Sequence, residues 1–85
     1  MINTILSQFT TYLLSGKNRS EHTVKAYQTD IKGFFSWLQQ QYSLNDPSEV
    51  TPQMIRSWVV ELIDHNIQPA SVKRKIASLR SFYNY

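Results

Sequence analysis

Residues 20–42 carry apolar side chains at helical spacing over about five turns, and no other feature constrains the fold as strongly. The stripe consists of Val24, Tyr27, Ile31, Phe34, Phe35, Leu38 and Tyr42. At 100° per residue these side chains share one face of a helix. Because a helix must bury its apolar face against other elements, the segment predicts a long amphipathic helix within a helical bundle.

Two shorter segments repeat this periodicity, one before the long helix and one after it. The first carries Ile2, Ile5, Leu6, Phe9 and Leu13, and the second carries Ile55, Trp58, Val59 and Leu62. Gly16 stands where a glycine C-cap would end the first helix. Asn45-Asp-Pro-Ser is expected to break the long helix.

Helix-start signals precede the later segments. Ser20 is expected to N-cap the long helix, and Thr51 to N-cap the next one. Pro52 and Pro69 then fall at first helical positions, where a missing N–H costs nothing. No stretch longer than a few residues alternates with strand period. The sequence therefore predicts one domain over residues 1–85, an all-α, compact four-helix bundle.

Composition limits the setting of this domain. The chain has 85 residues, is 41% hydrophobic and contains no cysteine. It is too apolar to be disordered, and it cannot form a disulfide or a thiolate metal site. It shows no signal-peptide pattern and no apolar run long enough to cross a membrane. We expect a soluble domain, and the absence of cysteine fits a reducing compartment.

Residues 71–85 form a basic amphipathic helix with four cations and no acid. Val72, Ile76, Leu79 and Tyr83 share its predicted core face. The predicted outward strip holds Ser71, Arg74, Ser78 and Ser81, and Lys73 and Arg80 project from one flank. Hydroxyl and guanidinium donors without bulky neighbours suit a helix lying against phosphates and base edges. Basic amphipathic helices also serve membranes and partner proteins, so this helix alone leaves those alternatives open.

The start of the long helix is a second candidate anion site. Lys17, Arg19, Ser20 and Thr23 bring cations and hydroxyls to a helix N-terminus, whose free amides favour anions. The net charge is +2 over residues 17–32, −3 over residues 33–70 and +4 over residues 71–85. Such polarisation can orient a domain on a polyanion.

Some residues allow a structural interpretation beside a functional one. Thr23, Ala26, Asp30, Gly33 and Trp37 lie on one flank of the long helix, where helix packing is favoured over a ligand contact. Asp30 can pair with Arg80, which would compete with a role for Arg80 in binding. Trp58, Phe82 and Tyr27 are expected in the core.

The ordered set of these motifs resembles the N-terminal core-binding domain of tyrosine recombinases, also called phage integrases. The resemblance rests on Ser20-x-x-Thr23-x-x-x-Tyr27-x-x-Asp30-Ile31-x-x-Phe34-x-x-Trp37-Leu38, then Thr51-Pro52, then Ser71-Val-x-Arg74-x-Ile-Ala-Ser-Leu79-Arg80-x-Phe82-Tyr83. It covers about residues 3–85. It implies a SAM-like four-helix domain that clamps one side of a DNA duplex, with its second and fourth helices toward the major groove.

The resemblance also implies where the chemistry lies. Members of the family cleave DNA with a tyrosine nucleophile supported by arginines, a lysine and histidines, all in a separate C-terminal domain. We expect that domain to be absent from this chain, so none of its tyrosines, Tyr85 included, is predicted to be catalytic. His22 and His65 lack metal-ligand spacing. No catalytic residue, metal or cofactor is predicted.

The resemblance implies double-stranded DNA and other recombinase protomers in a synaptic complex as partners, and no membrane. It also implies a cytoplasmic protein of bacterial or phage origin, and we expect the isolated domain to be monomeric. The predicted DNA-binding residues are Lys17, Arg19, Ser20, Thr23, Ser71, Lys73, Arg74, Ser78, Arg80 and Ser81. The alternative is a helical protein-interaction module that mediates protomer assembly, since SAM-like domains can also oligomerise.

Overall fold

Four α-helices and two short helical turns make up the computed structural model, which describes residues 2–17 and 19–85 and side chains from Thr4 onward. The α-helices are α1 (Ile2–Thr11), α2 (Glu21–Tyr42), α3 (Pro52–Asp64) and α4 (Pro69–Tyr83). A π-helical turn, η1 (Tyr12–Gly16), continues α1, and a 3₁₀ turn, η2 (Pro47–Glu49), precedes α3. The described residues contain no strand, so the predicted all-α four-helix architecture is confirmed.

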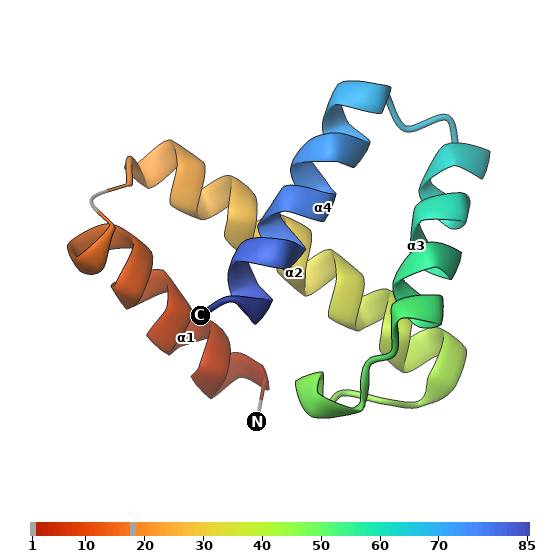
Figure 1. Ribbon diagram of the computed structural model, residues 1–85, viewed down its shortest axis with the longest axis horizontal. Coiled ribbons are helices and arrows are strands. Elements are labelled where there is room, and N and C mark those ends of the chain that lie inside the picture. The colour runs from red at the N-terminus through yellow and green to blue at the C-terminus, as the bar shows by residue number, and fades with distance from the viewer. Residues whose placement is uncertain (1, 18) are drawn as a thin grey trace.

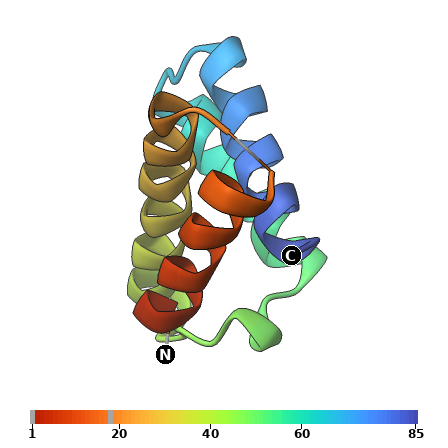
Figure 2. The ribbon, with the colours of Figure 1, turned by 90° about the vertical axis from the view of Figure 1, so that its left-hand side faces the viewer.

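Helix α2 is the central element, and α4 crosses it in the most extensive helix–helix contact of the molecule (Figure 1). Helices α1 and α3 lie on either side of α4, and Figure 2 shows α1 beside α2. The bundle measures 35 × 28 × 17 Å along its principal axes, so it is flat and presents two broad faces. The C-terminal end of the chain returns to α1, where the Tyr85 ring lies 5.6 Å from that of Phe9.

The core is built from the predicted stripes. Its buried apolar members are Leu6, Phe9, Leu13, Val24, Ile31, Phe34, Phe35, Leu38, Trp58, Val72, Leu79 and Phe82. Aromatic rings join the helices: Phe34 meets Trp58 edge-on at 4.9 Å, and Phe82 meets Phe9 at 5.4 Å. The core positions predicted for Trp58 and Phe82 are thus confirmed. Ile2 was also predicted in the first stripe, but its side chain lies outside the described ones.

The predicted N-caps are present. The Ser20 hydroxyl accepts a hydrogen bond from the Thr23 amide at 3.2 Å, and the Thr51 hydroxyl accepts one from the Met54 amide at 3.3 Å. Pro52 and Pro69 each stand as the first residue of their helices. These local signals fix three of the four helix starts because each satisfies, or removes, an amide that the helix leaves free.

The first helical segment ends at Gly16, as expected, but without the left-handed conformation typical of a glycine C-cap. No described glycine has a positive φ, and the helix ends in the π turn, where the Lys17 amide donates to the Tyr12 carbonyl at 3.1 Å. A Cβ on Gly16 would lie 3.2 Å from the Tyr12 ring, so the glycine makes room for that ring instead. The left-handed residues of the described chain are Ser43 and Asn66, which follow α2 and α3.

Gly33 also differs from expectation. Asp30 and Gly33 were predicted on the same flank of the long helix, and helix packing explains why Asp30 is buried there. A Cβ added at Gly33, however, would meet nothing within 4 Å. No close approach of another backbone therefore compensates for the glycine in the middle of α2.

Candidate functional site

A buried carboxylate links α2 to α4. Asp30 projects from α2 with only 1% of its surface exposed. Arg74 donates to both its oxygens, from Nε at 3.0 Å and from Nη2 at 2.9 Å. Lys75 adds a bond from Nζ at 3.1 Å, and the Ser78 hydroxyl donates at 2.8 Å. Two cations and one hydroxyl of α4 therefore hold a single acid of α2.

The charge of Asp30 is stabilised in this setting. Burial by itself raises the pKa of the Asp30 carboxyl, but hydrogen bonds from Arg74, Ser78 and Lys75 outweigh it and hold that pKa below its usual value. The same contact raises the pKa of the Arg74 guanidinium. Asp30 is thus ionised at neutral pH, and its charge is compensated.

This network turns α4 about its axis relative to the sequence prediction. The observed buried side chains of α4 are Val72, Ser78, Leu79 and Phe82. At 100° per residue this face is rotated by roughly 60° from the predicted one. Tyr83, which was predicted on the core face, is therefore displaced from it. Tyr83 is 42% exposed, and its hydroxyl donates to the Pro47 carbonyl at 2.7 Å.

Ser78 was predicted on the outward strip, and that placement is wrong. Its side chain is fully buried, and its hydroxyl is used by Asp30, so it cannot reach a partner. Arg74 is intermediate, because its guanidinium is bound to Asp30 while 47% of its side chain stays exposed. The expected pairing of Asp30 with Arg80 is replaced by pairs with Arg74 and Lys75.

The outward face of α4 is a different set from the predicted strip. Lys73, Ala77, Arg80 and Asn84 are exposed and follow one another at i, i+4, i+7 and i+11. On this face the long side chains of Lys73, Arg80 and Asn84 surround the small Ala77. A partner can therefore approach the helix backbone closely at Ala77.

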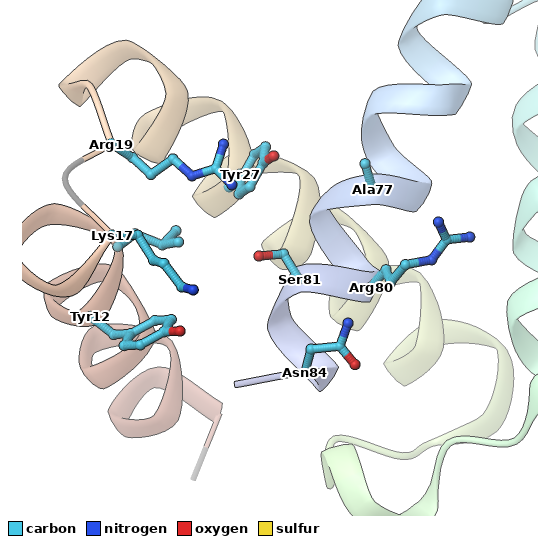
Figure 3. A pocket seen from close by; sticks show the side chains of 9 residues that line it. Tyr12, Lys17, Arg19, Tyr27, Ala77, Arg80, Ser81 and Asn84 are labelled. Carbon is cyan, nitrogen blue, oxygen red and sulfur yellow. The ribbon is translucent and has the colours of Figure 1, made fainter.

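A pocket of about 350 Å³ opens between this face of α4 and the end of α1. Figure 3 shows its lining, which consists of Tyr12, Leu13, Lys17, Arg19, Tyr27, Ala77, Arg80, Ser81 and Asn84. The Lys17 ammonium and the Ser81 hydroxyl point into the opening, whereas the Arg80 guanidinium extends away from it toward α3 (Figure 3).

The pocket is electropositive. Its lining includes Lys17, Arg19 and Arg80, and none of the nine lining residues is acidic. Lys17 Nζ lies 5.8 Å from the centroid of the Tyr12 ring, whose face favours a cation. Hydroxyl and amide groups from Ser81 and Asn84 supply neutral donors. The arrangement suits an anion that bears several acceptor oxygens.

The structure therefore divides the predicted site residues into three groups. Lys17, Arg19, Arg80 and Ser81 meet at the pocket. Ser20 and Thr23 lie at the start of α2, where their hydroxyls bond to each other at 2.9 Å. The remaining four lie on α4: Lys73 is exposed, Ser71 is half-buried, and Arg74 and Ser78 contact Asp30.

Sequence reasoning did not predict the other five lining residues as part of a site, namely Tyr12, Leu13, Tyr27, Ala77 and Asn84. Tyr27 was predicted in the core, and it is half-buried at the pocket wall. The helical spacing of Lys73, Ala77, Arg80 and Asn84 was visible in the sequence. The sequence analysis paired Asp30 with the wrong residue of α4. Its actual partners, Arg74, Lys75 and Ser78, must face α2 because a buried acid has to be paired, and this leaves Lys73, Ala77, Arg80 and Asn84 outward.

No group of three or more His, Asp or Glu residues in them is placed to hold a metal ion. None of the described helices combines the length and the apolar character that a membrane span would need.

The fold and the pocket together define a small all-helical domain with a basic, concave face and no acid in that concavity. The chain belongs to the family described as phage integrase, N-terminal SAM-like domain, which it matches over residues 6–85. The family resemblance seen in the sequence is thereby confirmed.

Individual relatives agree with this family. The chain is 36% identical to tyrosine recombinase XerC of Chlorobaculum parvum, over 94% of its own length and 25% of the relative. It is 38% identical to XerC of Listeria innocua, over 92% of its own length and 26% of the relative. It is 33% identical to XerD of the same organism, over 99% of its own length and 28% of the relative. The chain thus spans about a quarter of the length of these relatives. No solved structure matches it.

Proposed function

We propose that this domain is the DNA-binding clamp of a site-specific tyrosine recombinase and that it contacts the duplex through the start of α2 and the outward face of α4. The carrying observation is the pocket between Lys17, Arg19 and Ser81, in which donors converge without an acid. Phosphate oxygens are the acceptors that such donors fit best. The family membership gives the proposal its context, because the named relatives are tyrosine recombinases.

The contact has two parts. The pocket seats a backbone phosphate beside Lys17 and Arg19 and fixes the register of the domain on the duplex. The stripe of Lys73, Ala77 and Arg80 then follows the groove, where the small Ala77 allows close approach. Arg74 stands at the edge of this face with its guanidinium held by Asp30.

The chemistry of strand cleavage is assigned to a separate domain in this proposal. A tyrosine nucleophile needs positioned cations around the scissile phosphate and an acid for the leaving group. Tyr85, for example, has its ring against Phe9 and Tyr12 instead. Other recombinase protomers are the expected protein partners.

A salt titration of duplex binding tests the proposal. Three to five phosphate contacts give log K against log salt a slope of roughly −3 to −5, at about −0.9 per contact. Lys17→Ala and Arg19→Ala should each weaken binding and reduce the slope by about one unit. Lys32→Ala is the matched control, because this exposed cation lies about 140° around α2 from Tyr27.

Two results would contradict the proposal. One is duplex binding that does not change between low and moderate salt. The other is equal binding by Lys17→Ala, Arg19→Ala and Lys32→Ala, which would show that the pocket cations contribute no more than any surface cation.

A further inference from the structure

The outward side of α3 presents two large apolar side chains to solvent. Val60 and Ile63 are 56% and 58% exposed, the highest values among the large apolar side chains described. Helix α3 lies at the periphery of the bundle, with α4 on its inner side (Figure 1). Two adjacent aliphatic side chains one turn apart are therefore presented to solvent on one surface.

Charges of opposite sign flank these two residues. Arg56, Val60 and Asp64 follow at i, i+4 and i+8, so they lie within about 80° of one another on the helix. Arg56 and Asp64 are exposed, and neither takes part in a salt bridge among the described residues. The stripe thus reads cation, aliphatic pair, anion along the helix axis.

This pattern is self-complementary when it is reversed. If two copies of α3 pack antiparallel about a two-fold axis at Val60, Arg56 of one copy lies level with Asp64 of the other. The two Val60 side chains meet at the axis, with Ile63 beside them. Both charge pairs form at once, because an isologous contact repeats each interaction.

We propose that α3 docks a second copy of this chain through Arg56, Val60, Ile63 and Asp64 in an antiparallel pair. Polyanions are disfavoured as the occupant, because residues 33–70 carry a net charge of −3. The surface belongs to a different helix from the basic pocket, so the contact leaves the proposed DNA face free.

The proposed contact between two α3 helices is small, so the association should be weak. Four side chains on three turns of one helix fall well short of the roughly 800 Å² per partner that a stable interface buries. Dilute protein is therefore expected to be monomeric. The contact becomes populated where copies are held at millimolar effective concentration, as on adjacent sites of one duplex.

Disulfide trapping tests the contact and its orientation, because the chain has no cysteine of its own. Val60→Cys at about 1 mM protein, under mild oxidation, should give a covalent dimer, since the two positions meet at the axis. Gln53→Cys is the orientation control: in the antiparallel pair its two copies lie roughly 20 Å apart, too far to bridge. Gln40→Cys, exposed on α2, measures random collision.

Charge reversal tests the register in the Val60→Cys background. Arg56→Asp and Asp64→Arg should each slow cross-linking by about tenfold, because each brings like charges together twice. The double variant should restore the rate to within about twofold of the parent. The proposal is overturned if Val60→Cys cross-links no faster than Gln40→Cys, if Gln53→Cys matches it, or if the double variant fails to recover.

Discussion

Replacing Arg74 with alanine tests the central role of the Asp30 network. The sequence alone predicts that this change leaves the fold intact within about 0.5 kcal/mol, because Arg74 was placed on the outward strip. The structure reverses that prediction. Arg74→Ala removes two charge-assisted hydrogen bonds, of 3.0 and 2.9 Å, from a carboxylate that is 1% exposed.

The loss of stability in Arg74→Ala depends on which partners Asp30 keeps. Removing every partner of a buried charge costs about 3–5 kcal/mol. Here Lys75 at 3.1 Å and Ser78 at 2.8 Å still hold Asp30, and Arg74 is itself half exposed. The loss is therefore closer to that of a hydrogen bond to a charged group, about 1.5–3 kcal/mol. For a domain of this size it corresponds to a fall in Tm of about 8–16 °C for a 2 kcal/mol loss.

Urea unfolding followed by far-UV circular dichroism measures this, with Lys73→Ala as the control from the exposed face of the same helix. The pH dependence has a defined sign. A carboxyl whose pKa is lowered by folding stabilises the native state above its unfolded pKa of about 3.9, and that contribution disappears as the pH falls through the folded pKa. The difference between parent and Arg74→Ala should shrink at pH 3. Equal unfolding of Arg74→Ala and Lys73→Ala at pH 7 would refute the reasoning.

Three further substitutions probe other parts of the fold. Gly33→Ala should raise the free energy of unfolding by about 1 kcal/mol, because the added Cβ meets nothing and α2 gains helix propensity. A variant that melts at a lower temperature than the parent protein would contradict this. Leu79→Ala should cost about 2–5 kcal/mol by opening a core cavity, which denaturant titration would show, and a cost under 1 kcal/mol would argue against its burial. Tyr83→Phe should cost about 0.5–1.5 kcal/mol by freeing the Pro47 carbonyl. Burial and the nearby Asp46 raise the pKa of Tyr83 to about 12, so stability from this group should fall as the pH rises from about 10 through 12, with phenolate absorbance as the readout.

The sequence by itself determined the four helices and where three of them start. Their apolar periodicity, the N-caps at Ser20 and Thr51 and the prolines at helix starts are local signals, because each depends on residues within a turn or two. The ordered motifs also pointed to the correct family. Gly16 ends the first helical segment as expected, but the π turn that precedes it and the Tyr12 ring beside it were not predicted.

Tertiary structure alone decided how α4 is turned. Its sequence allows a core face with Ile76 and Tyr83 or one with Ser78 and Phe82, since Val72 and Leu79 belong to both. The choice depends on Asp30, which is more than 40 residues away and must be paired when buried.

The pocket was likewise beyond local reasoning. It joins Lys17 and Arg19, at the end of the first helix, to Ser81 and Asn84 near the end of the last. No periodicity within one segment reports such a meeting, because it is set by how α1 and α4 pack against α2. Residue types and helix faces are read from neighbours along the chain, whereas the convergence of donors is decided by packing between distant segments.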